Sequence, residues 1–558
     1  MNPSNRLLAP RLARWRAPAL AAAALLGAPL AWGACVVNSP THSQATAGSN
    51  CTATRSSHMN MPDAVLADTG GQLTIPHAFS LTAGSWVNPG RAPVRAEGAN
   101  AFIRFAGRLD VAQNGGNNSY GVLARAGGKI VVQGPTHVTL LPSGQYRRGV
   151  LSLGAGSEIE LADVTVISSG AATPRGPSAE SGGKLTYRTA NLNLHGYNGA
   201  FGIRQDDPNG DLIGGDTFIK VSGPASWAAL VEGPMHINGK LDIESADGIG
   251  LYIRAVGQAH IGANSEIKGT SGTAVRIQSS DPTPLMAGNG LQITYPVASG
   301  TAFDAQNTAA ASTTLAGATV KAETLWIASG RDYTFNAQGG TYTGKSSGNP
   351  LTLKMSNAAV WNLNANSNLK TLELTGNAVL RPDQSRTLTA FDAAGVKNTS
   401  GVIDLTDATP AVNDVLTIAG NYAGGGKLKL DVNLASGGGG AIGVDADALK
   451  VTGNVTGSTQ IQVTALPGAG IATTGNGILV AEVSGTSPAN AFTLAAPVIS
   501  GGLQYTLHQV GNRWYLQSSP YTGANVASVP TLSHLGLLLT GGLLAGAAAR
   551  ARRRQKQA

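Results

Sequence analysis

The sequence contains few charged, aromatic and sulfur-containing residues. Only 13% of its 558 residues are charged and 5% are aromatic, and it has six methionines, two cysteines and nine histidines. No group of cysteines and histidines has the spacing of a zinc site. His137, His236 and His260 lie in strand-like runs, where a packed or solvated imidazole is far commoner than a metal ligand. We therefore expect no metal and no cofactor.

The excess of basic residues is confined to the two ends of the chain. Four arginines lie within the first 16 residues, and four arginines and one lysine lie within the last nine. Without these nine residues, 30 of the 39 basic residues remain against 31 acidic ones, so the body is nearly neutral. The body also lacks a basic patch interleaved with aromatic residues. We expect no nucleic-acid ligand.

The amino-terminal end has the features of an export signal. Its arginines precede an apolar stretch at residues 17–32, and Ala31-Trp-Gly33 places small residues where a signal peptidase reads them. We predict a signal peptide at residues 1–33. Trp32 is a poor residue three positions before a lipoprotein cysteine, so we predict instead a Cys35–Cys51 disulfide, formed in an oxidising compartment.

The carboxyl-terminal end combines a short motif, an apolar segment and a basic cluster. The motif is Val529-Pro-Thr-Leu-Ser533, the apolar run covers residues 535–549, and residues 529–549 could cross a bilayer core of about 30 Å as a helix. This layout resembles the IPTL-CTERM class of sorting signals, with Val529 in place of isoleucine. The resemblance implies processing by an exosortase-like enzyme; an ordinary tail anchor is the alternative. The residues expected to act are Val529, Pro530, Thr531, Leu532 and Ser533 in the motif and Arg550, Arg552, Arg553 and Arg554 at the membrane.

The body shows no helical periodicity and reads as many short strands separated by turns. A strand-turn-strand unit at residues 121–130 is repeated at residues 149–159 and again at residues 250–261. Units that recur every 20 to 30 residues or so must stack on one another to bury their apolar faces. We predict an all-β fold, a single right-handed parallel β-helix, in preference to several sandwich or barrel domains.

The last part of the body resembles pertactin-like autotransporter passengers. Leu351-Thr-Leu-Lys-Met-Ser-Asn-Ala-Ala-Val-Trp361 matches their final coils, and the segments Gly426-Lys-Leu-Lys-Leu-Asp431 and Asp447-Ala-Leu-Lys-Val451 match their autochaperone segment. The resemblance implies a β-helix passenger at residues 34–350 and autochaperone-like coils at 351–517, followed by a linker at 518–528. We expect the largest side chains of the body to concentrate in this carboxyl-terminal cap. Its expected core is Leu449, Ile478, Phe492, Leu494, Tyr505, Trp514 and Tyr515.

The chain departs from this family after the autochaperone-like segment. Only 42 residues follow Leu516, too few for the many strands of an outer-membrane translocator barrel. We therefore expect the sorting tail to take the place of the barrel in delivering the protein to the cell surface, the outer membrane or the medium, with transient anchoring by the tail.

The sequence gives little support to two kinds of enzyme chemistry. The acid-rich segment at residues 206–216 contains Asp206, Asp207, Asp211 and Asp216, but the Gly-His-Gly of β-helix glycosidases is missing, and the spacing fits no calcium loop. The Gly-Asp-Ser-Gly nucleophile loop of passenger proteases is missing too. Asp, Asn, Pro and Gly are also the residues that turns require.

Recognition of an extracellular ligand is the remaining function class. A long β-helix exposes columns of side chains, and we expect loops at residues 171–181 and 206–216 to project from it. Gly330-Arg-Asp332 has the wrong order for an integrin motif. We predict a non-enzymatic, adhesin-like protein that binds an extracellular protein or glycan. The alternatives are a β-helix carbohydrate-active enzyme and a structural matrix component.

Overall fold

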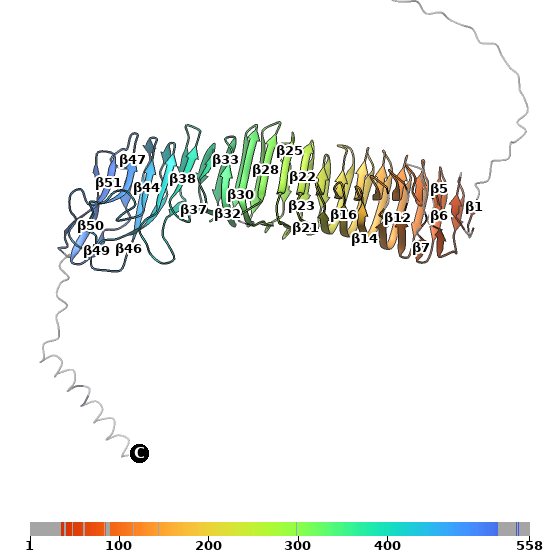
Figure 1. The fold of residues 1–558 in the computed structure, drawn as a ribbon, viewed down its shortest axis with the longest axis horizontal. Helices are drawn as coiled ribbons and strands as arrows, with labels where there is room; N and C mark the ends of the chain where they lie inside the picture. The colour runs from red at the N-terminus through yellow and green to blue at the C-terminus, as the bar shows by residue number, and fades with distance from the viewer. Residues whose placement is uncertain are drawn as a thin grey trace, which may run out of the picture.

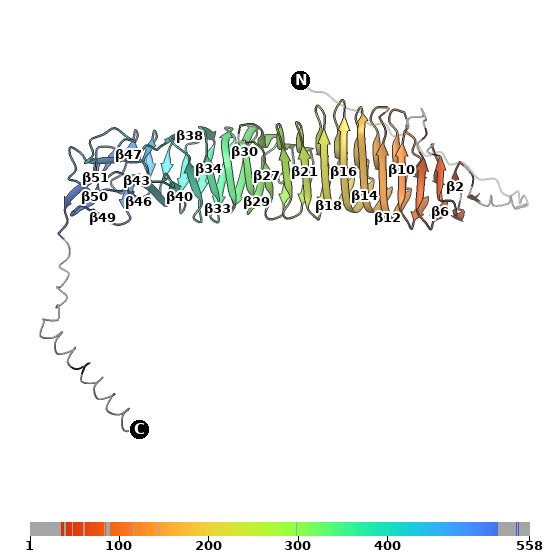
Figure 2. The same cartoon turned by 60° about the horizontal axis from the view of Figure 1, so that its bottom comes forward.

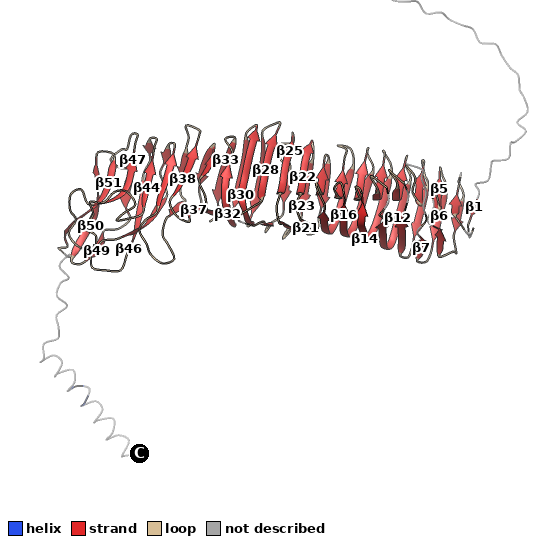
Figure 3. Cartoon of the chain, in the orientation of Figure 1, coloured by secondary structure: helices blue, strands red, loops and turns tan. Residues whose placement is uncertain are grey.

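The chain forms a long rod of stacked β-coils, and sequence order follows the rod from one end to the other (Figure 1). The computed structural model describes residues 35–522, except positions 38, 40, 47, 60, 61, 83, 85–89, 115, 143 and 297, together with residues 543 and 545. Strands joined by turns make up the rod (Figure 3). The prediction of an all-β parallel β-helix is confirmed.

Three ladders of parallel strands run along the rod. The first ladder consists of β2 (Ser43–Ala45), β5 (Val65–Asp68), β8 (Val94–Glu97), β11 (Tyr120–Arg125), β13 (Arg148–Leu153), β15 (Arg175–Glu180), β17 (Phe201–Gln205), β19 (Trp227–Val231), β22 (Ile249–Ala255), β25 (Thr273–Ser279), β28 (Thr301–Asn307) and the second halves of β30 (Thr319–Gly330) and β32 (Thr341–Ser347). β1 (Cys35–Val36) pairs with β2 in the antiparallel direction.

The second ladder consists of β3 (Asn50–Thr52), β6 (Gln72–Ile75), β9 (Phe102–Phe105), the first halves of β12 (Lys129–Leu140), β14 (Glu158–Ala171), β16 (Lys184–Gly196) and β18 (Asp211–Ser222), then β20 (Pro234–Ile237), β23 (Gln258–Ile261), β26 (Leu285–Ala287), β29 (Ala311–Ala316), β31 (Tyr333–Gln338), β33 (Leu351–Ser356), β36 (Thr371–Leu374), β39 (Val396–Asn398), β42 (Tyr422–Ala423) and β45 (Val455–Thr456).

The third ladder consists of β4 (Ser57–Met59), β7 (Phe79–Thr82), β10 (Leu109–Gln113), the second halves of β12, β14, β16 and β18, then β21 (Leu241–Ser245), β24 (Glu266–Gly269), β27 (Gln292–Thr294), the first halves of β30 and β32, and β34 (Val360–Leu363), β37 (Val379–Pro382), β40 (Val402–Asp404), β43 (Lys427–Val432), β46 (Thr459–Ala465) and β48 (Phe492–Leu494). Figure 2 shows these strands side by side along the rod.

A separate eight-stranded sheet closes the carboxyl-terminal end. It begins with β35 (Ser367–Leu369), β38 (Arg386–Ala390), β41 (Val415–Ala419), β44 (Ala448–Val451) and β47 (Ile478–Val483), which are parallel. It ends with β51 (Arg513–Pro520), β50 (Leu503–Val510) and β49 (Val498–Ser500), which are antiparallel. The hairpin therefore covers the last coil, and β51 occupies the first three residues of the predicted linker.

The sequence repeats correspond to coils. The unit at residues 121–130 covers most of β11 and the start of β12, and the unit at 149–159 does the same for β13 and β14. Between β11 and β12 the chain turns through Gly127, which has a φ of 88°. A Cβ on the next residue, Gly128, would lie 2.3 Å from the carbonyl oxygen of Ala96 on the neighbouring coil, so only glycine fits there.

One continuous apolar core runs inside the rod, but its largest side chains do not gather where we expected. Phe303, Trp326, Phe335, Tyr342 and Trp361 stack in the middle coils with ring centroids 4.9–6.1 Å apart. The expectation that the cap holds the main aromatic cluster is therefore wrong. Strands that lie in register place large rings on adjacent coils directly against one another.

The two predicted projecting loops are also largely strand. Most of residues 171–181 forms β15, which is almost entirely buried, and β18 begins at Asp211. Only the turn at residues 206–210 remains of the second loop. These polar residues form strands because each coil pairs its backbone with both neighbours, whatever the side-chain type.

Candidate functional site

The outward side of the first ladder carries a connected surface of charged and aromatic side chains, which we call the arginine–aromatic face. Parallel strands place equivalent residues of successive coils about 4.8 Å apart, so their side chains form columns along the rod. In one column Tyr120, Arg148, Arg175, Phe201 and Trp227 follow one another in register. The whole face comprises Tyr120, Tyr146, Arg148, Arg175, Glu180, Phe201, Arg204, Asp206, Trp227, Glu232, Tyr252 and Arg254.

Each side chain of this column precedes a very small residue. The residues after Tyr120, Arg148, Arg175 and Phe201 are glycines, and the residue after Trp227 is alanine. A Cβ at Gly202 would lie 2.3 Å from the carbonyl oxygen of Ala228 on the next coil. The small residue therefore lets the coils approach closely, while the residue before it points outward.

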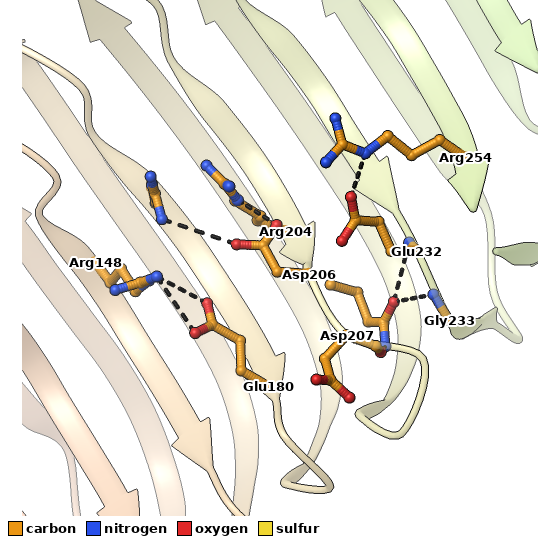
Figure 4. Close-up of polar contacts among 10 residues, drawn as sticks. Arg148, Glu180, Arg204, Asp206, Asp207, Glu232, Gly233 and Arg254 are labelled. Carbon is orange, nitrogen blue, oxygen red and sulfur yellow. Dashed lines mark hydrogen bonds and ion pairs between the residues drawn. The ribbon is translucent and has the colours of Figure 1, made fainter. Parts of the chain in front are cut away.

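Ion pairs cross from coil to coil on this face (Figure 4). Arg148 Nη2 lies 3.0 Å from Glu180 Oε1, and both side chains are nearly buried. Asp206, which directly follows β17, accepts a hydrogen bond from Nε of Arg204 on that strand and lies 3.9 Å from Arg175 Nη1.

One coil further along, Arg254 Nε donates to Glu232. Each of these three acids is therefore held by at least one guanidinium.

The guanidinium groups also lie against aromatic rings. Arg175 Cζ is 5.3 Å from the ring centroid of Tyr146 and 5.5 Å from that of Phe201, and Arg204 Cζ is 4.9 Å from Phe201. Such contacts contribute about 0.5–2 kcal/mol each, depending on desolvation.

The aromatic column continues as edge-to-face contacts. The ring centroids of Phe201 and Trp227 are 5.1 Å apart, as are those of Trp227 and Tyr252. Charged groups and aromatic rings thus lie among one another over six successive coils, from β11 to β22.

Burial perturbs the titration of this face. Burial, followed by repulsion from Arg204 and Arg148, lowers the pKa of Arg175 to about 10, so the group stays charged at neutral pH. Burial also raises the pKa of Glu180 above its ordinary value, and the neighbouring Arg148 opposes that shift. The face is preorganised, because its charges are fixed by partners rather than free in solvent.

Gln205 holds the turn beside the face. Its side-chain Nε2 donates to the carbonyl oxygen of Gly210 at 2.8 Å, and its Oε1 accepts from the backbone N–H of Glu232 at 3.2 Å and from that of Gly233. The glutamine is fully buried. It therefore joins the turn at residues 206–210 to the next coil and positions Asp206.

The four aspartates of the acid-rich segment do not meet at one site. Asp206 belongs to the arginine–aromatic face, whereas Asp207 Oδ1 accepts from the backbone N–H of Asn209 within the turn. Asp211 begins β18, and Asp216 Oδ1 accepts from the backbone N–H of Lys240 on the next coil. Asp207, Asp211 and Asp216 thus have structural roles in a turn or a strand, which agrees with the turn-forming composition of this segment.

The described residues contain no group of three or more histidine, cysteine, aspartate or glutamate side chains placed to hold a metal ion. His236 and His260 stack on neighbouring coils with ring centroids 4.6 Å apart. His137 Nδ1 lies 3.7 Å from Asp110 Oδ1, in a half-exposed position.

The predicted cap residues surround the last coils. Leu449, Ile478, Phe492, Tyr505, Trp514 and Tyr515 are buried, and Leu494 is partly buried against the same core. Tyr505 Oη donates to the carbonyl oxygen of Ile471 at 2.7 Å. Trp514 Nε1 donates to Ser487 Oγ at 3.0 Å.

The structure contains the Cys35–Cys51 disulfide, with the two Cα atoms 5.8 Å apart. It links β1 to β3 at the amino-terminal end of the rod. The predicted signal peptide, the sorting motif and the basic cluster lie outside the described residues. In the described part of the chain, no helix is long and apolar enough to cross a membrane.

Sequence reasoning missed the arginine–aromatic face. A signal for it was present, since an arginine or aromatic residue precedes glycine at Tyr120, Arg148, Arg175 and Phe201. Glu180 follows at the end of β15, and Asp206 comes directly after β17. Without the register between coils, nothing in the sequence places these residues in contact.

Two segments in the carboxyl-terminal third of the chain match known protein families. The Autochaperone Domain Type 1 family matches residues 392–507, and the IPTL-CTERM motif matches residues 527–554. The probable autotransporter YfaL of Escherichia coli (strain K12) is 36% identical over 133 residues, which are 22% of this chain and 10% of that protein. The uncharacterized protein YuaQ of the same organism is 35% identical over 142 residues, 24% of this chain and 10% of that protein.

The matched segments are thus about a tenth of the length of these two relatives. The crystal structure of the Haemophilus influenzae Hap adhesin matches with a TM-score of 0.34 and 11% identity, over 86% of this chain and 63% of that one. The predicted resemblance is confirmed: the chain is similar to pertactin-like autotransporter passengers and carries an autochaperone segment and a carboxyl-terminal sorting signal. These features indicate export to the cell surface.

Proposed function

We propose that the protein is a non-enzymatic, adhesin-like surface protein, and that its arginine–aromatic face binds an extracellular protein or glycan. The observation that supports this proposal is the interleaving of guanidinium groups and rings on adjacent coils. Arginine and aromatic side chains dominate the binding energy of recognition surfaces, because they combine large apolar area with directed hydrogen bonds. Their ordered positions reduce the entropy lost on binding.

Substitution of exposed rings tests this proposal. Tyr146 is 43% exposed and lies over Arg175, and Trp227 is half-buried in the same face. The double variant Tyr146→Ala with Trp227→Ala should weaken binding to host cells or extracellular matrix about ten-fold or more. Phe391→Ala is the matched control, since Phe391 is 55% exposed and lies outside the face. Equal binding by the wild type and both variants would contradict the assignment.

The alternative is a β-helix carbohydrate-active enzyme. One observation favours it, because Glu180 ends β15, Asp206 directly follows the adjacent strand β17, and burial raises the pKa of Glu180. Retaining glycosidases need two carboxyls about 5 Å apart. Turnover of acidic polysaccharides that disappears in the Glu180→Gln, Asp206→Asn variant would replace the adhesin proposal. Assembly of the protein with itself, without cell binding, would instead indicate a matrix component.

We also propose that an exosortase-like enzyme reads the sorting motif at residues 529–533 and releases the protein from transient membrane anchoring. The match to the IPTL-CTERM motif supports this. Mass spectrometry of the mature surface protein should find the chain ending near the motif, and Pro530→Ala should leave the basic end attached. A mature wild-type chain that still carries Arg554 would contradict processing.

A further inference from the structure

A groove on a different side of the rod has the features of a second binding site. It has a volume of about 690 Å³, within the range of ligand sites, and it lies where the strands of the third ladder shorten from β18 to β27 and lengthen again at β30. Its lining includes Lys220, Glu244, Lys268, Thr294 and Lys321. None of these residues belongs to the arginine–aromatic face.

These five residues form one register column. Lys220 pairs with Glu244, Glu244 with Lys268, Lys268 with Thr294, and Thr294 with Lys321. At about 4.8 Å per coil the column is about 19 Å long, and a lysine recurs every second coil, about 10 Å apart. The groove thus presents a row of three evenly spaced cations along the rod axis.

The three lysines of the row differ in their ion pairs. Glu244 lies 3.1 Å from Lys220 Nζ and 3.3 Å from Lys268 Nζ, so one carboxylate is shared between two lysines. Lys268 Nζ also lies 3.6 Å from Glu266 Oε2 on its own strand. The hydrogen bond from Lys220 is the largest cause that lowers the pKa of Glu244, and that carboxylate is therefore charged at neutral pH. Lys321 is exposed and has no ion pair among the described residues. The column keeps a net positive charge.

We infer that this groove binds an extended acidic polysaccharide that carries one carboxylate per disaccharide. The spacing of the cations selects among polyanions. A nucleic-acid strand carries a phosphate about every 3.4 Å, far denser than a lysine about every 10 Å with an acid between the first two. An extended acidic peptide presents same-face side chains about every 6.6 Å.

Two further features suit a sugar chain. The hydroxyls of Ser222, Thr270 and Thr294 lie along the groove, where they can exchange hydrogen bonds with sugar hydroxyls. The strands that line it are already paired on both sides within the third ladder, so an extended peptide finds no free strand edge there. A carboxylate-bearing glycan is the ligand class that matches both the charges and the hydroxyls.

The test measures binding of a fluorescent hyaluronan decasaccharide, a glycan with one carboxylate per disaccharide, to the purified protein. Lys321→Gln should weaken binding about three- to five-fold, the loss expected for one exposed charge pair, and Lys268→Gln with Lys321→Gln should weaken it further, to about ten-fold or more. Glu244→Gln should tighten binding about three-fold, because it releases Lys220 and removes one of the two carboxylates that neutralise Lys268. A merely structural role for the column does not predict this opposite sign.

Lys427→Gln is the matched control, since Lys427 is also exposed, lies on β43 of the third ladder and has no ion pair among the described residues. It should bind like the wild type. The inference is overturned if the wild type does not bind the decasaccharide, if Lys321→Gln and Lys427→Gln behave alike, or if a thymidine 20-mer binds as tightly and with the same sensitivity to Lys321→Gln. These outcomes are independent of the arginine–aromatic face.

Discussion

The middle coils and the carboxyl-terminal cap bury their chain in different ways. In the middle, Phe303, Trp326 and Phe335 stack between coils that each have two parallel neighbours. In the cap, the hairpin of β50 and β51 covers the last coil in the antiparallel direction, and Trp514 contacts Phe492 at 5.4 Å between ring centroids. A middle coil is stabilised by an equivalent coil on each side. The last coil has such a neighbour on one side only, and the hairpin covers its other side.

Polar groups sharpen this contrast. On the arginine–aromatic face, regular coils place charges outside the apolar core, as pairs such as Arg148 with Glu180. The cap encloses Asp431 and Asp447, both fully buried. Asp447 accepts hydrogen bonds from the backbone N–H groups of Asp414 and Asp431 at 3.1 and 2.8 Å. In this irregular region the carboxyl group of Asp447 thus accepts hydrogen bonds from backbone N–H groups. In the regular coils, backbone carbonyl groups of the neighbouring coil accept them.

The largest expected effect comes from removing one large ring in each region. Trp326→Ala and Trp514→Ala should each lower the free energy of unfolding by about 3–5 kcal/mol, because both leave a buried cavity. If the cap is the folding nucleus, Trp514→Ala should mainly slow refolding, while Trp326→Ala should mainly speed unfolding. Stopped-flow fluorescence measures both rates. The reverse partition would place the nucleus in the middle coils.

The second effect concerns pH and the cap alone. Burial raises the pKa of Asp447 to about 7, against backbone hydrogen bonds that lower it. Because the folded pKa exceeds the unfolded value, the folded state holds the proton longer. The contribution of Asp447 to stability should therefore be fully present below about pH 4 and be lost as the pH rises to about 7, by up to about 4 kcal/mol.

Urea unfolding at pH 4.5 and 7.5 measures this dependence. Asp447→Asn should reduce the difference between the two pH values, because the amide does not titrate. A variant that retains the full difference would assign the dependence to other groups, such as Asp431 or Asp414, whose pKa values burial also raises.

The smallest effect tests the arginine–aromatic face, whose regular coils lie nearer the amino-terminal end. Arg148→Met should destabilise the protein by about 2–3 kcal/mol, because it leaves Glu180 nearly buried without its closest cation. Glu180→Gln in the same chain should recover most of that loss, since the neutral amide has a smaller desolvation cost. Thermal unfolding of the single and double variants measures the coupling. Additive losses would show that the pair has no net interaction.

Much of the architecture could be predicted from the chain. The strand-turn-strand units at residues 121–130 and 149–159 predicted coils, and the ordered motifs after Leu351 predicted the autochaperone segment. The prediction that residues 171–181 form a projecting loop was wrong, because the serine, proline and glycine residues of this segment form part of β15. Turn-forming residues stay in strands when both neighbouring coils offer backbone partners, a condition that a single sequence does not display.

The sequence by itself determined that the chain must stack repeated coils, since short strands with small-residue turns cannot bury an apolar face alone. Only the tertiary structure decided which outward side chains meet. Tyr120 and Arg148 are 28 residues apart but Trp227 and Ile249 only 22, so coil length varies along the rod. Each coil's turns set its register, and the register aligned the arginines with rings on one side and the lysines of the groove on another.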